Sequence, residues 1–161
     1  MNMLKIRCSM LASLTLLLIL PMALHAQTMS PKEVVALMME AEKAADVEAQ
    51  IALFAEDAVY MVLPASPDMP VPLVGKDAIR ERRVAITSPD AISVAEIIGG
   101  EGDTVITTVR FSSDQFRSLG LEYIEGNEEY VVRDGKITNY TWTMTEASLT
   151  EMTAAMSPPA Q

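Results

Sequence analysis

Hydrophobic and polar positions alternate with a period of two through most of the second half of the chain. This pattern is typical of strands that bury one face. It covers four runs, residues 92–98, 104–111, 121–133 and 137–144. Asp134 and Gly135 between the last two runs are a strong signal for a two-residue hairpin turn. These runs predict an antiparallel meander.

The final run divides its side chains unevenly between two faces. Strict alternation puts Thr138, Tyr140, Trp142 and Met144 on one face, and Ile137, Asn139, Thr141 and Thr143 on the other. One face therefore combines two amphipathic aromatic rings with a Met. A hairpin of this kind is marginal alone and needs further strands or a helix against its apolar face.

The first third of the chain predicts helices. Ser30 and Glu33 have the spacing of a capping box, and Pro31 suits the first helical position. An apolar stripe at helical spacing follows to about Lys43, consisting of Val34, Leu37, Met38 and Ala41. Asp46 is expected to cap a second short helix that buries Ile51, Leu53 and Phe54 and ends at Glu56 and Asp57.

Residues 58–63 are rich in β-forming side chains and predict a strand, followed by a proline-rich loop over 64–72. A third helix is expected over 76–83, with Arg80, Arg82 and Arg83 on its solvated face. Helices segregated from an antiparallel sheet predict an α+β domain. We expect a strongly curved sheet that wraps round the N-terminal helices as a cone with one open mouth.

Three shorter segments complete the prediction. Residues 112–120 read as an insertion-like loop, and Gly126 inside a strand predicts a bulge or bend. Residues 146–156 can form a short terminal helix. As domain boundaries we expect a signal peptide at 1–26, one domain at 27–150 and a disordered tail at 151–161.

The N-terminal boundary depends on a secretory pattern. Lys5 and Arg7 precede an uncharged apolar run, and Ala26 is a small residue before a cut at Gln27. The run is shorter than the roughly 20 residues of a spanning helix, which favours cleavage over an uncleaved anchor. We therefore expect a periplasmic or secreted protein.

Composition narrows the possible chemistry. Without the signal peptide, 10 basic and 22 acidic residues remain, a net charge of −12 that disfavours nucleic acid and anionic membranes as partners. The only Cys (Cys8) and the only His (His25) leave with the signal peptide. The exported chain then has no disulfide, thiol nucleophile or imidazole base, and acid–base work falls to Asp, Glu, Tyr or Lys. We assign no metal-binding residue and expect no cofactor.

Four motifs carry a resemblance to a known family, namely residues 46–58, 75–79, 130–137 and 140–142. They are similar to the SnoaL-like branch of the nuclear-transport-factor-2-like (NTF2-like) superfamily, which includes ketosteroid isomerases, polyketide cyclases and limonene epoxide hydrolases. The resemblance covers nearly all of the chain after residue 26. It implies a cone-shaped α+β barrel, often a homodimer packed through the outer face of its sheet.

The resemblance does not carry the ketosteroid isomerase mechanism over. The position of that family's catalytic base falls on Val62, or on Leu63 with one insertion, and both are apolar. The position of its oxyanion-hole Tyr falls on Met38. Only the second oxyanion-hole acid has a match, at Glu128. A steroid-isomerase mechanism therefore lacks its base.

Glu128 is the candidate catalytic residue, as a carboxylate enclosed by an apolar aromatic cone. The alternative is that Glu128 and Glu129 lie near a strand end with both carboxylates in water. The walls of the predicted pocket are Met38, Tyr60, Val62, Tyr130, Tyr140, Trp142 and Met144.

Three functions remain open at this point. The first is an exported domain that binds a small apolar or carbonyl-bearing molecule without chemistry. The second is a cofactor-independent isomerase, cyclase or hydratase with Glu128 as its proton carrier. The third is a structural module that dimerises or docks to an envelope partner.

Overall fold

The computed structural model describes residues 29–65, 72–87 and 90–157 of the chain. The predicted signal peptide lies outside the described residues, as do 66–71 of the proline-rich loop and 158–161 of the tail. The helices are α1 (Pro31–Lys43), α2 (Val47–Leu53), α3 (Lys76–Ile86), α4 (Asp114–Ser118) and α5 (Glu146–Met156). The strands are β1 (Phe54–Leu63), β2 (Leu73–Val74), β3 (Ile92–Gly99), β4 (Thr104–Ser112), β5 (Ile124–Arg133) and β6 (Lys136–Met144).

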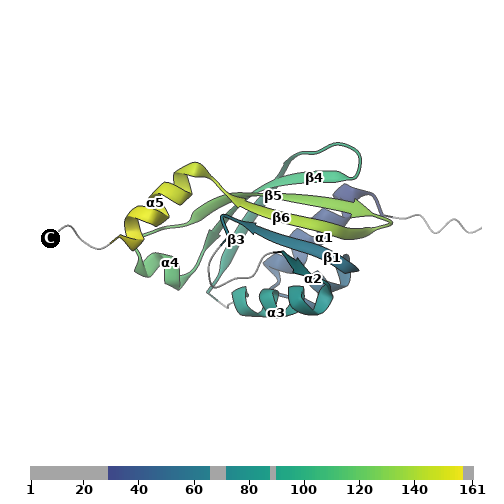
Figure 1. Ribbon diagram of the computed structural model, residues 1–161, viewed down its shortest axis with the longest axis horizontal. Helices are drawn as coiled ribbons and strands as arrows, with labels where there is room; N and C mark the ends of the chain where they lie inside the picture. The colour runs from purple at the N-terminus through teal and green to yellow at the C-terminus, as the bar shows by residue number, and fades with distance from the viewer. Residues whose placement is uncertain (1–28, 66–71, 88–89, 158–161) are drawn as a thin grey trace, which may run out of the picture.

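The strands form one sheet in the order β2-β1-β6-β5-β4-β3. All neighbours are antiparallel except β1 and β6, which run parallel. The sheet is curved and unclosed, and α1, α2 and α3 cover its concave side, while α5 lies at the far end of β5 (Figure 1). The predicted α+β class with a curved sheet around N-terminal helices is confirmed.

The helix starts follow the predicted capping. The side chain of Ser30 accepts a hydrogen bond from the backbone N–H of Glu33, whose carboxylate accepts from the backbone of Ser30 in return. Asp46 accepts from the backbone N–H of Ala49 at 2.9 Å and so caps α2. These local interactions orient α1 and α2 against the sheet.

Two boundaries differ from the prediction. The second helix ends at Leu53 rather than at Glu56 and Asp57, because Phe54 already pairs with Ile137 in the parallel ladder of β1 and β6. The predicted loop at 112–120 contains α4, capped by Ser113.

At the C-terminal end, the predicted helix over 146–156 is confirmed as α5. The predicted tail at 151–161 therefore begins inside this helix. Ser148 of α5 is buried and accepts a hydrogen bond from the backbone N–H of Glu125 at 2.8 Å, which attaches the helix to the first residues of β5.

The hairpin forms at Asp134 and Gly135, which both have positive φ angles, as a type I′ turn requires. The strict alternation predicted for β6 is wrong at its first residues. Val131 pairs with Asn139 but Val132 pairs with Ile137, so Thr138 is an extra residue in β6. This bulge brings Ile137 into the same core as Tyr140.

Gly126 does not produce the predicted bulge. It pairs regularly with Val109 of β4 and Met144 of β6. A Cβ atom on Gly126 would lie 2.5 Å from Cε2 of Trp142, so the glycine is needed because the indole ring packs directly on its backbone.

We therefore predict that Gly126→Ala destabilises the protein by about 1–3 kcal/mol, since the indole must move to admit the methyl group. Gly99→Ala is the matched control, because a Cβ at that strand position meets no atom within 4 Å. Urea denaturation followed by fluorescence of Trp142, the only Trp of the chain, measures both. Equal stabilities of the two variants would contradict this packing.

Candidate functional site

Glu128 lies in the interior between the sheet and the helices, with only 3% of its surface exposed. Three hydroxyl groups donate hydrogen bonds to its carboxylate. Thr107 Oγ1 and Tyr130 Oη donate to Oε2 at 2.7 and 2.8 Å, and Tyr140 Oη donates to Oε1 at 2.7 Å. A carboxylate, which only accepts, suits three hydroxyl donors. We call these four residues the Glu128 cluster.

The cluster follows from strand register. Glu128 pairs with Thr107 of β4 on one side and with Trp142 of β6 on the other. Alternation along β5 then turns Glu128 and Tyr130 inward, while Glu129 faces solvent. The alternative in which both glutamates lie in water is therefore wrong for Glu128 and correct for Glu129.

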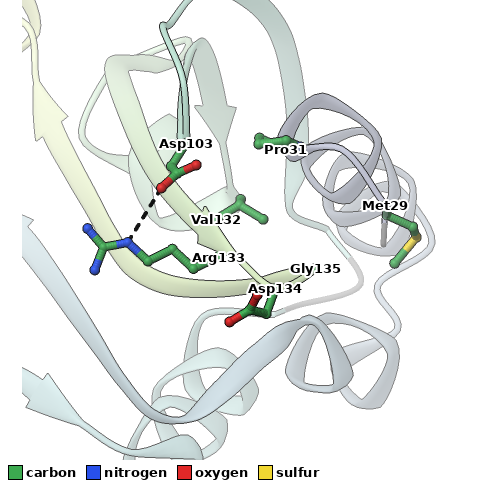
Figure 2. Close-up of a pocket in the computed structure, with 7 residues that line it drawn as sticks. All are labelled: Met29, Pro31, Asp103, Val132, Arg133, Asp134 and Gly135. Carbon is green, nitrogen blue, oxygen red and sulfur yellow. Dashed lines mark ion pairs between the residues drawn. The ribbon is translucent and has the colours of Figure 1, made fainter. Parts of the chain in front are cut away.

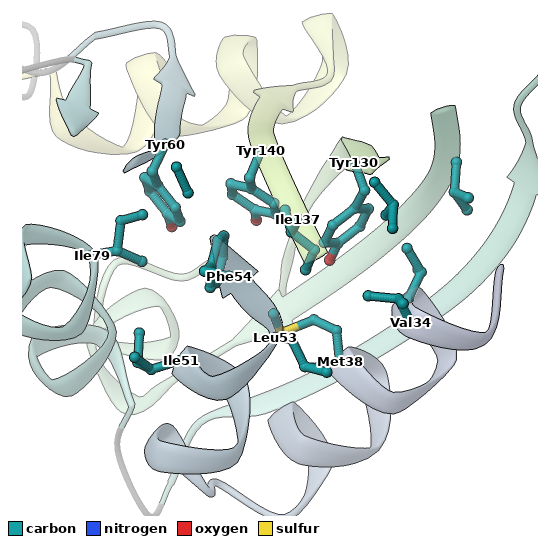
Figure 3. Packing of buried hydrophobic residues seen from close by; sticks show 14 residues of the cluster. Val34, Met38, Ile51, Leu53, Phe54, Tyr60, Ile79, Tyr130, Ile137 and Tyr140 are labelled. Atoms are coloured by element: carbon teal, nitrogen blue, oxygen red, sulfur yellow. The ribbon is translucent and has the colours of Figure 1, made fainter. Parts of the chain in front are cut away.

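The tyrosines form a continuous aromatic wall. The rings of Tyr60 and Tyr140 stack with centroids 4.6 Å apart, and Tyr130 meets Tyr140 edge-on at 5.1 Å. Figure 3 shows the three rings in a row, pointing from the sheet toward the helices. Burial, together with the neighbouring Glu128 carboxylate, raises the pKa of Tyr130 and of Tyr140 well above the ordinary value. Both phenols therefore stay protonated and continue to donate to Glu128.

A second polar centre joins two helices above this wall. Arg83 of α3, 5% exposed, donates from Nη1 to Oε1 of Glu42 in α1 at 2.7 Å. Its guanidinium carbon lies 5.1 Å from the ring centroid of Tyr140 and 5.5 Å from that of Tyr60, within cation–π range. We call Glu42 and Arg83 the helix pair.

Sequence reasoning missed the helix pair. The prediction that Arg83 is solvated with Arg80 and Arg82 is wrong, because Arg83 follows the buried Ile79 by four residues and shares its helix face. Glu42 likewise follows Met38 by four residues. A charged residue at the next position of a buried stripe was the signal available in the sequence. Thr107, also missed, alternates with Val105 and Val109 on the inward face of β4.

The electrostatics of Glu42 are unusual for a salt-bridged acid. Burial raises its pKa to about 7, the positive charge of Arg83 opposes this rise, and the negative charge of Glu128 adds to it. Within the described residues, this interior brings together the carboxyl groups of Glu42 and Glu128 and the guanidinium of Arg83, and a pKa of about 7 makes the charge of Glu42 sensitive to pH near neutrality.

This pKa predicts a pH-dependent stability. Between the ordinary value of 4.5 and about 7, folded Glu42 holds a proton that the unfolded chain releases, so the free energy of unfolding should fall as pH rises through this interval, by about 1–3 kcal/mol. Glu42→Gln should remove that fall. Glu40→Gln, exposed on the same helix, should keep the wild-type slope. Urea denaturation across the interval measures the slope, and an unchanged slope in Glu42→Gln would refute the assignment.

The structure separates the predicted pocket residues into two groups. Met38, Tyr60, Tyr130 and Tyr140 are buried in the core. Val62, Trp142 and Met144 are only partly buried. They lie among the last residues of strands β1 and β6, and Val62 is directly opposite Trp142. The concave face therefore has a buried interior that contains polar groups, and an apolar end whose side chains are partly exposed.

A surface cavity of about 350 Å³ lies elsewhere, beside the β5–β6 turn (Figure 2). Its walls are Met29, Pro31, Asp103, Val132, Arg133, Asp134 and Gly135, so no predicted site residue lines it. In the described parts of the chain, no group of three or more Asp, Glu, His or Cys residues is arranged to hold a metal ion. No helix in these parts is long and apolar enough to cross a membrane.

Comparison with known proteins agrees with the predicted family. The family model of the SnoaL-like domain matches residues 35–140. No curated protein sequence matches the chain. Solved NTF2-like structures do match, and at identities below 25% this likeness concerns the fold alone.

Three of these structures illustrate the range of the fold. A ketosteroid isomerase-like protein from Kribbella flavida is 18% identical, covering 81% of this chain and 83% of its own, with a TM-score of 0.57. A polyketide cyclase-like protein from Sinorhizobium meliloti is 23% identical, covering 68% and 93%, with a TM-score of 0.54. A computationally designed 17-OHP binder is 20% identical, covering 75% and 95%, with a TM-score of 0.60.

Proposed function

The chain belongs to the SnoaL-like domain family, and from this premise we propose that it is an exported domain that binds a small molecule on the concave face of its sheet. The observation that carries the proposal is the Glu128 cluster, a carboxylate held by three hydroxyl groups beside the partly exposed Trp142. Small-molecule sites typically combine apolar walls with a few fixed polar groups.

The energetics of burial support a binding role. A buried carboxyl group costs free energy that packing with apolar side chains of similar volume would avoid. This interior holds Glu128 and Glu42, and Arg83 besides. Val62, Trp142 and Met144 add apolar surface that is still partly accessible. Such a combination orients a ligand better than it stabilises a fold.

The structural relatives support the same class of ligand. One is named as a binder of 17-OHP, and others as isomerase-like and cyclase-like proteins. A small, largely apolar molecule with a carbonyl group is consistent with the names of these proteins. It also suits the aromatic wall of Tyr60, Tyr130 and Tyr140.

Ligand binding is tested with 17-OHP as the probe. We expect it to change the fluorescence of Trp142, because the indole lies at the partly open end of the concave face. Glu128→Gln should bind 17-OHP with little change in affinity, because the three hydroxyl donors already occupy the Glu128 carboxylate, which holds the tyrosine wall in place rather than the ligand. The matched control is Glu129→Gln, the exposed neighbour on the same strand. If 17-OHP and a panel of apolar ketones all leave the fluorescence unchanged, the proposal fails.

The proposed export has a test of its own. The signal-peptide pattern of residues 1–26 supports a periplasmic or secreted location after a cut between Ala26 and Gln27. Native mass spectrometry of protein recovered from the exporting cell reports the mass of the cleaved chain together with any small molecule that copurifies. A mass that retains residues 1–26 would contradict export by cleavage.

A second candidate is a cofactor-independent isomerase, cyclase or hydratase with Glu128 as proton carrier. The positions of Tyr130 and Tyr140 favour it, since a phenol that turned its O–H from Glu128 to a substrate carbonyl could polarise that carbonyl. An enzyme would lose turnover in Glu128→Gln while retaining ligand affinity. The variant also turns an amide N–H₂ toward hydroxyl donors, so a lower melting temperature is expected in either case.

A third candidate is a dimerising or docking module. Ile92 and Val94 are each more than half exposed on the same face of edge strand β3, and Ile98, also more than half exposed, is an extra residue where the pairing with β4 shifts. We expect this face to support a homodimer. Val94→Glu should then shift sedimentation toward the monomer, whereas Val74→Glu, at an equally exposed position on β2, should not. A monomeric wild type at micromolar concentration would remove this candidate.

A further inference from the structure

Arg83 carries more hydrogen-bond donors than its surroundings use. Nη1 donates to Glu42, but among the described residues Nε and Nη2 have no hydrogen-bond partner, and both atoms are buried. A guanidinium is always charged and has no alternative to donating. Arginines as deeply buried as this one normally satisfy their N–H groups, because a buried donor without a partner has lost its hydrogen bonds to water and gained none in return.

These donors belong to a guanidinium that lies against the tyrosines of the concave face. The guanidinium carbon is 5.1 Å from the ring centroid of Tyr140 and 5.5 Å from that of Tyr60. Tyr140 in turn donates its hydroxyl hydrogen to Glu128. Arg83 is therefore on the helix side of the same interior that the Glu128 cluster occupies on the sheet side.

We propose that Nε and Nη2 of Arg83 bind the carbonyl oxygen of a neutral, largely apolar small molecule. This inference rests on the proposed binding function and names its polar anchor and its ligand class. One carbonyl oxygen has two lone pairs and matches two adjacent N–H groups. The aromatic surfaces of Tyr60 and Tyr140 beside Arg83 suit the apolar part of such a ligand.

Charge balance selects a neutral carbonyl over a carboxylate. Glu128, and Glu42 when it is ionised, already place negative charge in the interior beside Arg83. An anionic ligand would add a third acidic group to a closed interior, where repulsion between like charges is poorly screened. A ketone or aldehyde supplies the acceptor without adding charge.

The test is an NMR titration with two probes of matched shape, acetophenone and ethylbenzene, which differ only in a carbonyl group. The reporters are the Arg83 Nε–H signal and the Trp142 indole N–H signal. Acetophenone should move both signals. Ethylbenzene should move the Trp142 signal but leave the Arg83 signal in place.

Arg83→Lys keeps the positive charge for Glu42 and removes the planar pair of donors. It should weaken acetophenone about tenfold, which corresponds to about 1.4 kcal/mol, and ethylbenzene less than twofold, since only acetophenone accepts a hydrogen bond from the charged donors. Arg80→Lys is the control on the same helix, because Arg80 already pairs with Glu48 and Asp77 at the surface. If Arg83→Lys does not fold, the two wild-type signals alone decide.

The outcomes separate this inference from the proposed function. If both probes move Trp142 but neither moves Arg83, for instance because internal water occupies its N–H groups, the anchor is overturned and binding stands. If benzoate binds more tightly than acetophenone, the neutral class is overturned. If neither acetophenone nor ethylbenzene moves Trp142, the anchor falls, and the binding function falls with it when 17-OHP also leaves Trp142 unchanged.

Discussion

The constraint on which the rest of the structure depends is the carboxylate of Glu128 inside the concave sheet. Its donors come from three adjacent strands, with Thr107 on β4, Tyr130 on β5 and Tyr140 on β6. A slip of one residue between any two of these strands would turn its partners outward and leave buried polar atoms without partners. The cluster therefore specifies register as well as chemistry. An apolar core of equal volume would tolerate more than one pairing.

The helices meet this polar interior with charges of their own. Arg83 of α3 lies over the rings of Tyr140 and Tyr60 and bonds Glu42 of α1, so one side chain connects two helices and two strands. A buried ion pair of this kind is weak evidence for stability, because desolvation offsets much of the attraction. The raised pKa of Glu42 expresses the same cost. The arrangement contributes a specific orientation of these groups rather than stability.

The sequence predicted what depends on local pattern. The capping box at Ser30 and the turn at Asp134 follow from spacing along the chain. The family resemblance supplied the fold and the inward orientation of Tyr130 and Tyr140. The sequence did not predict what depends on neighbours distant in sequence. The extra residue at Thr138 is visible only against the pairing of β5.

The helix pair illustrates the same limit at the site. Glu42 and Arg83 are 41 residues apart, and although each extends a buried stripe of its own helix, neither helix alone shows that the other supplies its partner. Their burial becomes apparent only when α1 and α3 lie on one sheet. Gly126 is similar, since the reason for its missing side chain is the indole of Trp142 on the next strand.

Tyr140 makes the two polar centres one site rather than two. Its hydroxyl group donates to Glu128 at 2.7 Å, and the face of its ring lies 5.1 Å from the guanidinium carbon of Arg83. A shift of Arg83 toward a bound carbonyl would change its contact with this ring, and a shift of the ring would alter a hydrogen bond to Glu128. Glu128 also raises the pKa of Glu42, which is the partner of Arg83. A change at Glu128 would therefore change the pKa of Glu42. The protonation of Glu42 and the occupation of Arg83 must therefore be thermodynamically linked, whether or not any bond in the ligand is broken.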